Sequence, residues 1–123
     1  MKGKTILIAE DYSLIFTYLK LLLGKLGYNL IHAENGQQAV ETVTNNTTID
    51  IILMDVEMPV MNGLEATVQI REINNTIPII ALTGHEMDEY VQNVLNAGCN
   101  EYLSKPIDEK VLFNILDKYV SKS

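Results

Sequence analysis

The sequence has only one cysteine, Cys99, and fewer basic than acidic residues. A single cysteine cannot form an internal disulfide bond, so a reducing compartment and a cytoplasmic location are expected. Nine Lys and Arg residues against 16 Asp and Glu residues give a formal net charge of −7. Nucleic-acid-binding surfaces need a basic patch, so direct binding to nucleic acid is not expected. The acidic balance is compatible with a divalent cation or a basic protein partner.

The chain also lacks a long uninterrupted apolar segment. The apolar run at residues 5–9 is too short for the core of a signal peptide. The leucine-rich stretch 14–26 is no membrane span, because polar residues and a glycine interrupt it: Thr17, Lys20, Gly24 and Lys25. No repeat, long linker or low-complexity tract divides the 123 residues, which predicts a single domain over residues 1–123 with no membrane contact.

The stretch 49–63, IDIILMDVEMPVMNG, organises the rest of the chain. Residues 51–54 form a continuous apolar run, typical of a strand that is buried on both faces of a parallel sheet. Asp55 follows directly, and Pro59 cannot continue a central strand. The pattern therefore predicts a carboxylate at the carboxyl end of a buried strand, where open α/β sheets place their ligands. Because a buried ionised carboxylate is costly, Asp55 needs cationic or hydrogen-bonding partners.

Strand-like and helix-like segments alternate along the whole chain. Short apolar segments predict five strands, at residues 5–9, 29–33, 51–54, 78–83 and 101–103. Apolar residues at helical spacing predict five helices, at residues 13–27, 37–44, 63–73, 86–97 and 108–120. Strict alternation favours an α/β fold with a parallel sheet that helices cover on both faces. An open, doubly wound sheet is preferred, because a closed barrel needs eight such units.

Chemically distinctive residues stand at the carboxyl ends of four of these strands: Glu10, Asp11, Asp55, Thr83 and Lys105. The carboxyl ends of parallel strands meet in one crevice, so these side chains are expected together. Three crowded carboxylates repel one another unless a cation lies among them, and hard oxygen ligands favour Mg²⁺. A carboxylate beside Mg²⁺, an ammonium and a hydroxyl is what phosphoryl transfer to an aspartate requires. Asp55 is the expected nucleophile.

Five motifs in this order resemble the receiver domains of two-component response regulators, over essentially the whole chain. They are Glu10-Asp11 after ILIA, AENGQQA, MDVEMPVMNG, ALTG and AGCNEYLSKP. MPVMNGLEAT and YLSKPI are most similar to receivers attached to hybrid sensor histidine kinases. The resemblance implies a flavodoxin-like three-layer sandwich with strand order 2-1-3-4-5. It also implies a signalling domain rather than an enzyme, one that promotes its own aspartyl phosphorylation and dephosphorylation.

The resemblance assigns roles to the residues at the predicted site. Asp55 matches the phosphoacceptor, and Glu10 and Asp11 match the acidic pair that holds Mg²⁺ together with Asp55. The backbone carbonyl of Glu57 matches a further metal ligand. The implied phosphodonor is a sensor histidine kinase or a histidine phosphotransfer domain.

Three further residues match the family's switching apparatus. Thr83 matches the switch hydroxyl, Tyr102 the aromatic rotamer switch, and Lys105 the lysine before a proline with a cis peptide bond. The face formed by the fourth helix, fifth strand and last helix is then expected to contact a partner or output domain. Glu57 and His85 are expected at the rim, where they form a lid or simply point to water. Neither His32 nor His85 is expected to be a catalytic histidine.

Each residue taken alone has a simpler interpretation. Asp55 fits a structural or capping role, and Glu10-Asp11 fit a helix cap. Lysines such as Lys105 are common on surfaces, threonines such as Thr83 are common at strand ends, and Tyr102 fits a half-buried strand aromatic.

Three other functions share parts of the pattern. An aspartyl-phosphate phosphatase places its nucleophile in a D-x-D motif after the first strand. A flavin-binding module needs a Ser/Thr-rich phosphate loop where Glu10-Asp11 stand, and these acids repel phosphate. A receiver-like domain that is never phosphorylated usually lacks an acid or the lysine, and this chain keeps all of them.

Overall fold

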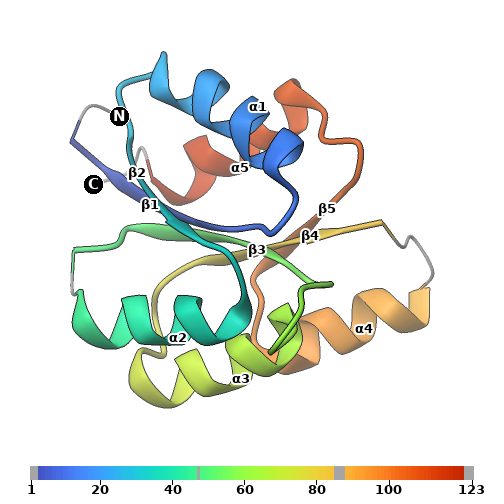
Figure 1. The fold of residues 1–123 in the computed structure, drawn as a ribbon. Helices are drawn as coiled ribbons and strands as arrows, with labels where there is room; N and C mark the ends of the chain where they lie inside the picture. Colours follow the sequence, from blue (N-terminus) through green and yellow to red (C-terminus); the bar gives the residue numbers. More distant parts are fainter. Residues whose placement is uncertain (1–2, 47, 85–87, 121–123) are drawn as a thin grey trace.

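The computed structural model describes residues 3–46, 48–84 and 88–120 (Figure 1). Five strands alternate with five helices within these residues. The strands are β1 (Thr5–Ala9), β2 (Asn29–Ala33), β3 (Ile51–Asp55), β4 (Ile79–Thr83) and β5 (Glu101–Ser104). The helices are α1 (Ser13–Gly24), α2 (Gly36–Asn45), α3 (Gly63–Ile73), α4 (Asp88–Ala97) and α5 (Glu109–Tyr119). None of the helices in the described part of the chain is long and apolar enough to span a bilayer.

All strand pairs are parallel, and the sheet order is β2-β1-β3-β4-β5. This confirms the predicted doubly wound α/β sheet, its strand order and the edge position of β2. α1 and α5 cover one face, and α2, α3 and α4 cover the other, which gives three layers (Figure 1). The carboxyl ends of β1, β3, β4 and β5 therefore share one edge of the molecule.

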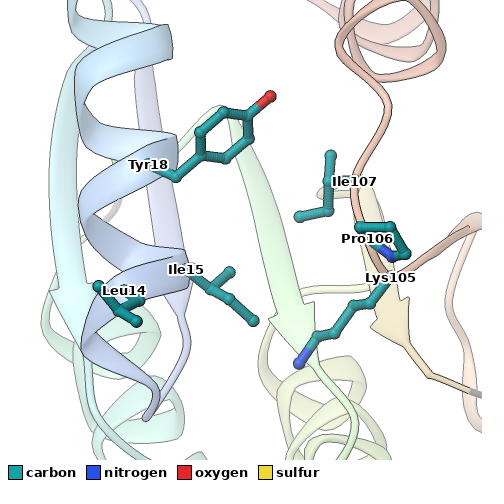
Figure 2. Close-up of a pocket in the computed structure, with 6 residues that line it drawn as sticks. All are labelled: Leu14, Ile15, Tyr18, Lys105, Pro106 and Ile107. Carbon is teal, nitrogen blue, oxygen red and sulfur yellow. The ribbon is translucent and has the colours of Figure 1, made fainter.

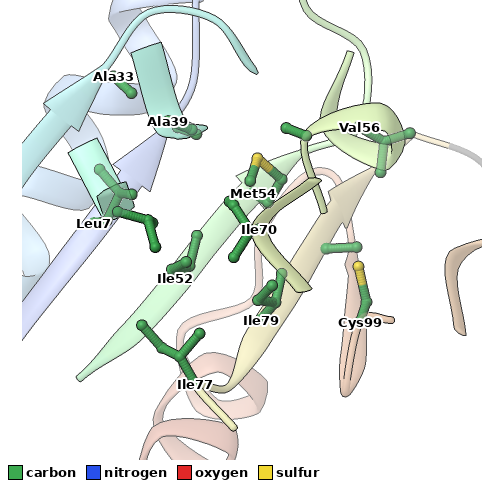
Figure 3. Close-up of a cluster of buried hydrophobic side chains, with 14 of the residues drawn as sticks. Leu7, Ala33, Ala39, Ile52, Met54, Val56, Ile70, Ile77, Ile79 and Cys99 are labelled. Atoms are coloured by element: carbon green, nitrogen blue, oxygen red, sulfur yellow. The ribbon is translucent and has the colours of Figure 1, made fainter. Parts of the chain in front are cut away.

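Two apolar clusters lie on the two faces of the sheet, because successive strand residues point to opposite sides. Ile52 and Met54 of β3 belong to the cluster under α2, α3 and α4 (Figure 3). Ile51 and Leu53 belong to the cluster under α1 and α5. Every residue of β3 is buried, as expected for the central strand of a parallel sheet.

Some helix ends and faces differ from the prediction. α1 ends at Gly24 rather than at Gly27, because residues 25–27 form a tight turn in which Gly27 has φ +88°. Val111 is one of the apolar residues at helical spacing in α5, and it is 45% exposed. The apolar stripe of a helix is wider here than the strip that contacts the sheet, so its margins face solvent.

Candidate phosphorylation and metal site

Strand register places the predicted site residues side by side. Met54 pairs with Ala9, so Asp55 lies beside the position where Glu10 follows β1. Asp55 itself pairs with Leu82, and Thr83 follows directly. Thr83 pairs with Ser104, the last residue before Lys105. Four residues that are far apart in sequence thereby reach one edge of the sheet.

Lys105 joins two buried carboxylates. Its Nζ atom is 3.1 Å from Asp55 Oδ1 and 3.3 Å from Glu10 Oε1. The backbone N–H of Lys105 donates to the carbonyl oxygen of Thr83 at 2.8 Å, which fixes where the side chain starts. The Lys105-Pro106 peptide bond is cis, as the resemblance implies. Lys105 is thus directed at the carboxylates and is not a solvated surface lysine.

The carboxylates of Glu10, Asp11 and Asp55 form a cluster with the chemistry of a divalent-cation site. One oxygen from each lies within 4.8 Å of the other two. With Lys105, the three acids leave two uncompensated negative charges, equal and opposite to the charge of one divalent cation. Glu10 Oε1 is buried and makes no well-formed hydrogen bond within the described residues, although Lys105 lies near it. All donors are oxygens, so these residues fit Mg²⁺.

The electrostatics of the site disfavour an ionised Asp55. Asp55 is 2% exposed, and burial together with the neighbouring Glu10 raises its pKa to about 7, although Lys105 opposes the shift. Burial alone would lower the pKa of the Lys105 ammonium, but Asp55 and Glu10 outweigh burial and raise that pKa. A positive charge added to the cluster is therefore strongly favoured, because it would stabilise the carboxylate form of Asp55.

The loop after β3 is held close to Asp55. The backbone N–H of Glu57 donates to Asp55 Oδ1 at 3.2 Å. A Cβ atom on Gly63 would collide with the carbonyl oxygen of Asp55, so only glycine permits this approach of α3. Gly36 is constrained in the same way by Met61, and its N–H donates to the Met61 carbonyl at 2.9 Å. The AENG and MNG motifs therefore hold the loop that follows the acceptor.

The helix-cap interpretation of the acidic pair is wrong. Tyr12 is the N-cap residue of α1, and no side-chain hydrogen bond caps this helix. Glu10 Oε2 instead accepts a hydrogen bond from the N–H of Tyr12 at 3.2 Å, outside the helix. The pair is directed toward Asp55 and Lys105.

Not every predicted site residue lies in this cluster. Tyr102 is on the edge strand β5 and is 40% exposed. Glu57 is exposed beside the acceptor, and His85 lies outside the described residues. His32, which sequence reasoning set aside, places its Nε2 atom 2.8 Å from the backbone carbonyl oxygen of Glu10. Nothing in the sequence around His32, three residues before an Asn-Gly turn, indicates that its side chain contacts Glu10.

An apolar groove of about 580 Å³ adjoins the site between α1 and the segment after β5 (Figure 2). Ile15 and Tyr18 of α1 face Pro106 and Ile107 across it, and Lys105 reaches from its wall toward the end of β3. Leu14, at the same end of α1, is 66% exposed. Leu14 and Tyr18 belong to the broad apolar stripe of α1, which contains more apolar positions than one packed face needs.

Comparisons with known proteins agree with this geometry. Residues 6–117 match the family model described as the response regulator receiver domain. The chain is 38% identical to hybrid signal transduction histidine kinase I of Dictyostelium discoideum, over 99% of this chain and 8% of the relative. It is 37% identical to the autoinducer 1 sensor kinase/phosphatase LuxN of Vibrio harveyi, over 99% of this chain and 14% of the relative. The chain thus spans a small part of these curated relatives.

Two solved structures are informative about the site. The receiver domain of a sensor histidine kinase from Pseudomonas aeruginosa PAO1 has a magnesium ion coordinated in its active site cleft. It superposes with a TM-score of 0.90 at 36% identity, over 98% of this chain and 99% of that chain. The Saccharomyces cerevisiae co-crystal structure of the histidine phosphotransfer protein Ypd1 with the receiver domain of Ssk1 matches with a TM-score of 0.89. There the identity is 28%, over 96% of this chain and 89% of that chain.

Proposed function

The chain belongs to the response regulator receiver domain family of two-component phosphorelays, and from this membership we propose that Asp55 is its phosphoacceptor. The observation that carries the proposal is the convergence of Asp55, Glu10 and Lys105, with Lys105 Nζ within 3.3 Å of both carboxylates. An ion pair that served stability alone would not need a second buried acid. The donor is a phosphohistidine on a sensor kinase or a phosphotransfer domain.

The transfer exchanges one bond to phosphorus for another. A carboxylate oxygen of Asp55 attacks the phosphorus, an O–P bond forms, and the N–P bond of the phosphohistidine breaks with its electron pair returning to the imidazole. Lys105 neutralises charge on the phosphoryl oxygens, and Thr83 donates its hydroxyl to one of them. Burial excludes bulk water, which strengthens both interactions.

Glu10, Asp11 and Asp55, with the backbone carbonyl of Glu57, are the residues that would hold Mg²⁺. The bound ion supplies positive charge next to the transferring phosphoryl group. Asp55 would then be ionised at neutral pH despite its burial. The domain thereby promotes its own phosphorylation and dephosphorylation and turns over no separate substrate, as expected of a cytoplasmic signalling domain.

The groove beside α1 is the proposed docking surface for the phosphodonor. In-line transfer requires the donor histidine to reach Asp55, so the donor must cover the rim of the site. The apolar side chains that rim it, Leu14, Ile15, Tyr18 and Ile107, offer such a partner an area to bury. A phosphotransfer protein bound to a similar receiver supports this choice of partner.

The output is proposed to lie on the opposite side of the site. Phosphorylation draws the Thr83 hydroxyl toward the phosphoryl group, and Tyr102 on β5 reorients in response. The face of α4, β5 and α5 then binds a partner or output domain. Its exposed residues include Tyr102 and Val111.

Labelling with a small phosphodonor tests the acceptor directly. The chain is incubated with acetyl phosphate and Mg²⁺, and its intact mass is measured. The wild type is expected to gain one phosphoryl group, and Asp55→Asn none. Asp50→Asn, just before the other end of β3, is the control and is expected to label normally. Undiminished labelling of Asp55→Asn contradicts the assignment, and an unlabelled wild type favours a receiver-like domain that is never phosphorylated.

A further inference from the structure

His32 holds the backbone of the acidic pair from the edge strand β2. Its Nε2 atom is 2.8 Å from the carbonyl oxygen of Glu10. A carbonyl oxygen only accepts hydrogen bonds, so this ring nitrogen carries the hydrogen and donates it. The N–H of Glu10 donates in turn to the carbonyl oxygen of Ala33 at 3.0 Å. Two consecutive residues of β2 therefore hold both backbone polar groups of Glu10.

The His32 ring is itself held by α1. It stacks on Phe16, with ring centroids 3.6 Å apart and ring planes 10° apart. Stacked rings restrict each other's rotamers, so the Nε2–H stays directed at Glu10. Phe16 lies one turn into α1, the helix that begins two residues after Asp11. His32 thus connects β2, the acidic pair and α1.

The held carbonyl determines how the chain enters Asp11. The Glu10 carbonyl belongs to the planar peptide unit that ends at the Cα atom of Asp11. Fixing this plane fixes the positions of the Asp11 N and Cα atoms, from which the Asp11 side chain leaves the backbone. This support matters more for Asp11 than for Glu10, because the Asp11 side chain is exposed whereas that of Glu10 is fully buried.

We propose that His32 is a positioning residue for the divalent-cation site, acting through the Glu10-Asp11 peptide. The inference rests on the proposed metal site and adds to it a residue that holds the backbone of two proposed ligands. Groups that orient metal ligands commonly change metal affinity by about 10- to 100-fold when removed. Because His32 acts on the backbone and not on a ligand atom, we expect the lower end of that range.

A magnesium titration followed by amide NMR tests the proposal without phosphorylation. The dissociation constant for Mg²⁺ is measured for the wild type, His32→Ala, His32→Gln and Phe16→Leu. His32→Ala is expected to weaken binding about tenfold. His32→Gln keeps a side-chain N–H at a similar reach and is expected to recover part of the loss. Phe16→Leu keeps the donor but loses the stacked ring, so a smaller loss is expected.

Two further variants calibrate the titration. Asn29→Ala removes an exposed polar side chain at the other end of β2 and is expected to leave the affinity unchanged. Asp11→Ala removes a proposed ligand and is expected to lose more affinity than His32→Ala. The same spectra report whether each variant is folded. If His32→Ala does not fold, His32→Gln and Phe16→Leu still test the proposal.

The outcomes separate the positioning role from the metal site. A wild type that does not bind Mg²⁺ refutes the metal site and, with it, the role of His32. Normal Mg²⁺ affinity in folded His32→Ala overturns the positioning role and leaves the metal site standing. A loss that His32→Gln does not relieve at all, with β2 resonances displaced throughout, assigns His32 a structural role instead.

Discussion

At the scale of single residues, the site concentrates charge in a place that disfavours it. Asp55 is buried beside Glu10, and only Lys105 compensates within the described cluster. Buried groups of this kind are retained for chemistry more readily than for stability, because well-packed apolar residues often serve stability equally well. Asp55 should therefore lower the stability of the folded state at neutral pH.

The pH dependence of unfolding tests this cost. The pKa of Asp55 rises from 3.8 to about 7 in the folded chain. Between these values the folded state binds more protons than the unfolded state, so stability falls as the pH rises through 7. Asp55→Asn should abolish this loss. Without Mg²⁺, the melting temperature of Asp55→Asn minus that of the wild type is expected to be roughly 10 °C larger at pH 8 than at pH 5.

Circular dichroism melts in EDTA at both pH values give this comparison, with Asp50→Asn as the control. If the difference between Asp55→Asn and the wild type were the same at pH 5 and pH 8, the raised pKa would be wrong. Added Mg²⁺ should raise the melting temperature of the wild type at pH 8 more than that of Asp55→Asn, because it favours the ionised acceptor.

The lifetime of the phosphoryl group is a second residue-scale property. Glu57 is exposed beside Asp55, and His85, two residues after Thr83 in the sequence, lies outside the described residues. The sequence predicts that these two side chains pair and limit the access of water to the acceptor. Glu57→Ala and His85→Ala should each speed dephosphorylation by up to about fivefold, the range of an exposed ion pair. The double variant should be less than additive.

The decay of the phosphorylated mass is followed over time for all four proteins. Equal or slower decay in both single variants means that no such pair forms. Additive effects in the double variant mean that the two side chains act separately.

At the scale of helices and strands, α1 has two roles. Leu19 and Leu23 pack on the sheet, while Leu14 and Leu21 face solvent. The inner residues hold the helix in place, and the outer ones are available to a partner. Changing the outer face should therefore affect docking without affecting the fold.

Leu14→Asp separates docking from chemistry. We expect phosphotransfer from a phosphorylated histidine phosphotransfer domain to slow about tenfold, equivalent to about 1.4 kcal/mol. Labelling by acetyl phosphate should be unchanged, because that donor needs no docking surface. Val68→Asp is the matched control, since Val68 is 50% exposed on α3, in the opposite layer. Equal slowing in both variants would argue for a general effect of charge.

At the scale of the whole molecule, the site lies between two surfaces: the groove beside α1, and the face of α4, β5 and α5. Lys105 contributes both to the carboxylate cluster and to the groove beside α1. Its backbone is bonded to Thr83 at the end of β4. A phosphoryl group bound by Lys105 and Thr83 would therefore contact the ends of both β4 and β5. The face of α4, β5 and α5 is then expected to change conformation on phosphorylation.

Amide hydrogen exchange with and without a phosphoryl mimic tests this direction of response. The largest change is expected between Thr83 and Pro106, because this segment starts at Thr83 and ends just after Lys105, the two residues proposed to bind the phosphoryl group. Little change is expected in α2, which packs on the far side of β1 and β2. Changes confined to β2 and α2 would refute the proposed output face.

The alternation of strands and helices, and the residues at the strand ends, could be predicted from the sequence. Buried parallel strands are short continuous apolar runs, and any polar residue that ends one must lie at the shared carboxyl edge. Small errors in boundaries do not change this result. The end of α1 and the exposed margins of α1 and α5 were less predictable, because periodicity shows that a face is apolar but not how wide a strip its neighbours cover.

By itself, then, the sequence determined the fold and the edge at which Asp55, Glu10 and Lys105 meet, since both follow from local patterns and from the geometry of parallel sheets. Only the tertiary structure decided which atoms contact one another. The ion pair between Lys105 and Asp55 spans 50 positions, and it depends on register between strands that local patterns leave open. The contact of His32 with the Glu10 backbone and the groove beside α1 depend likewise on packing between distant elements, which no single segment encodes.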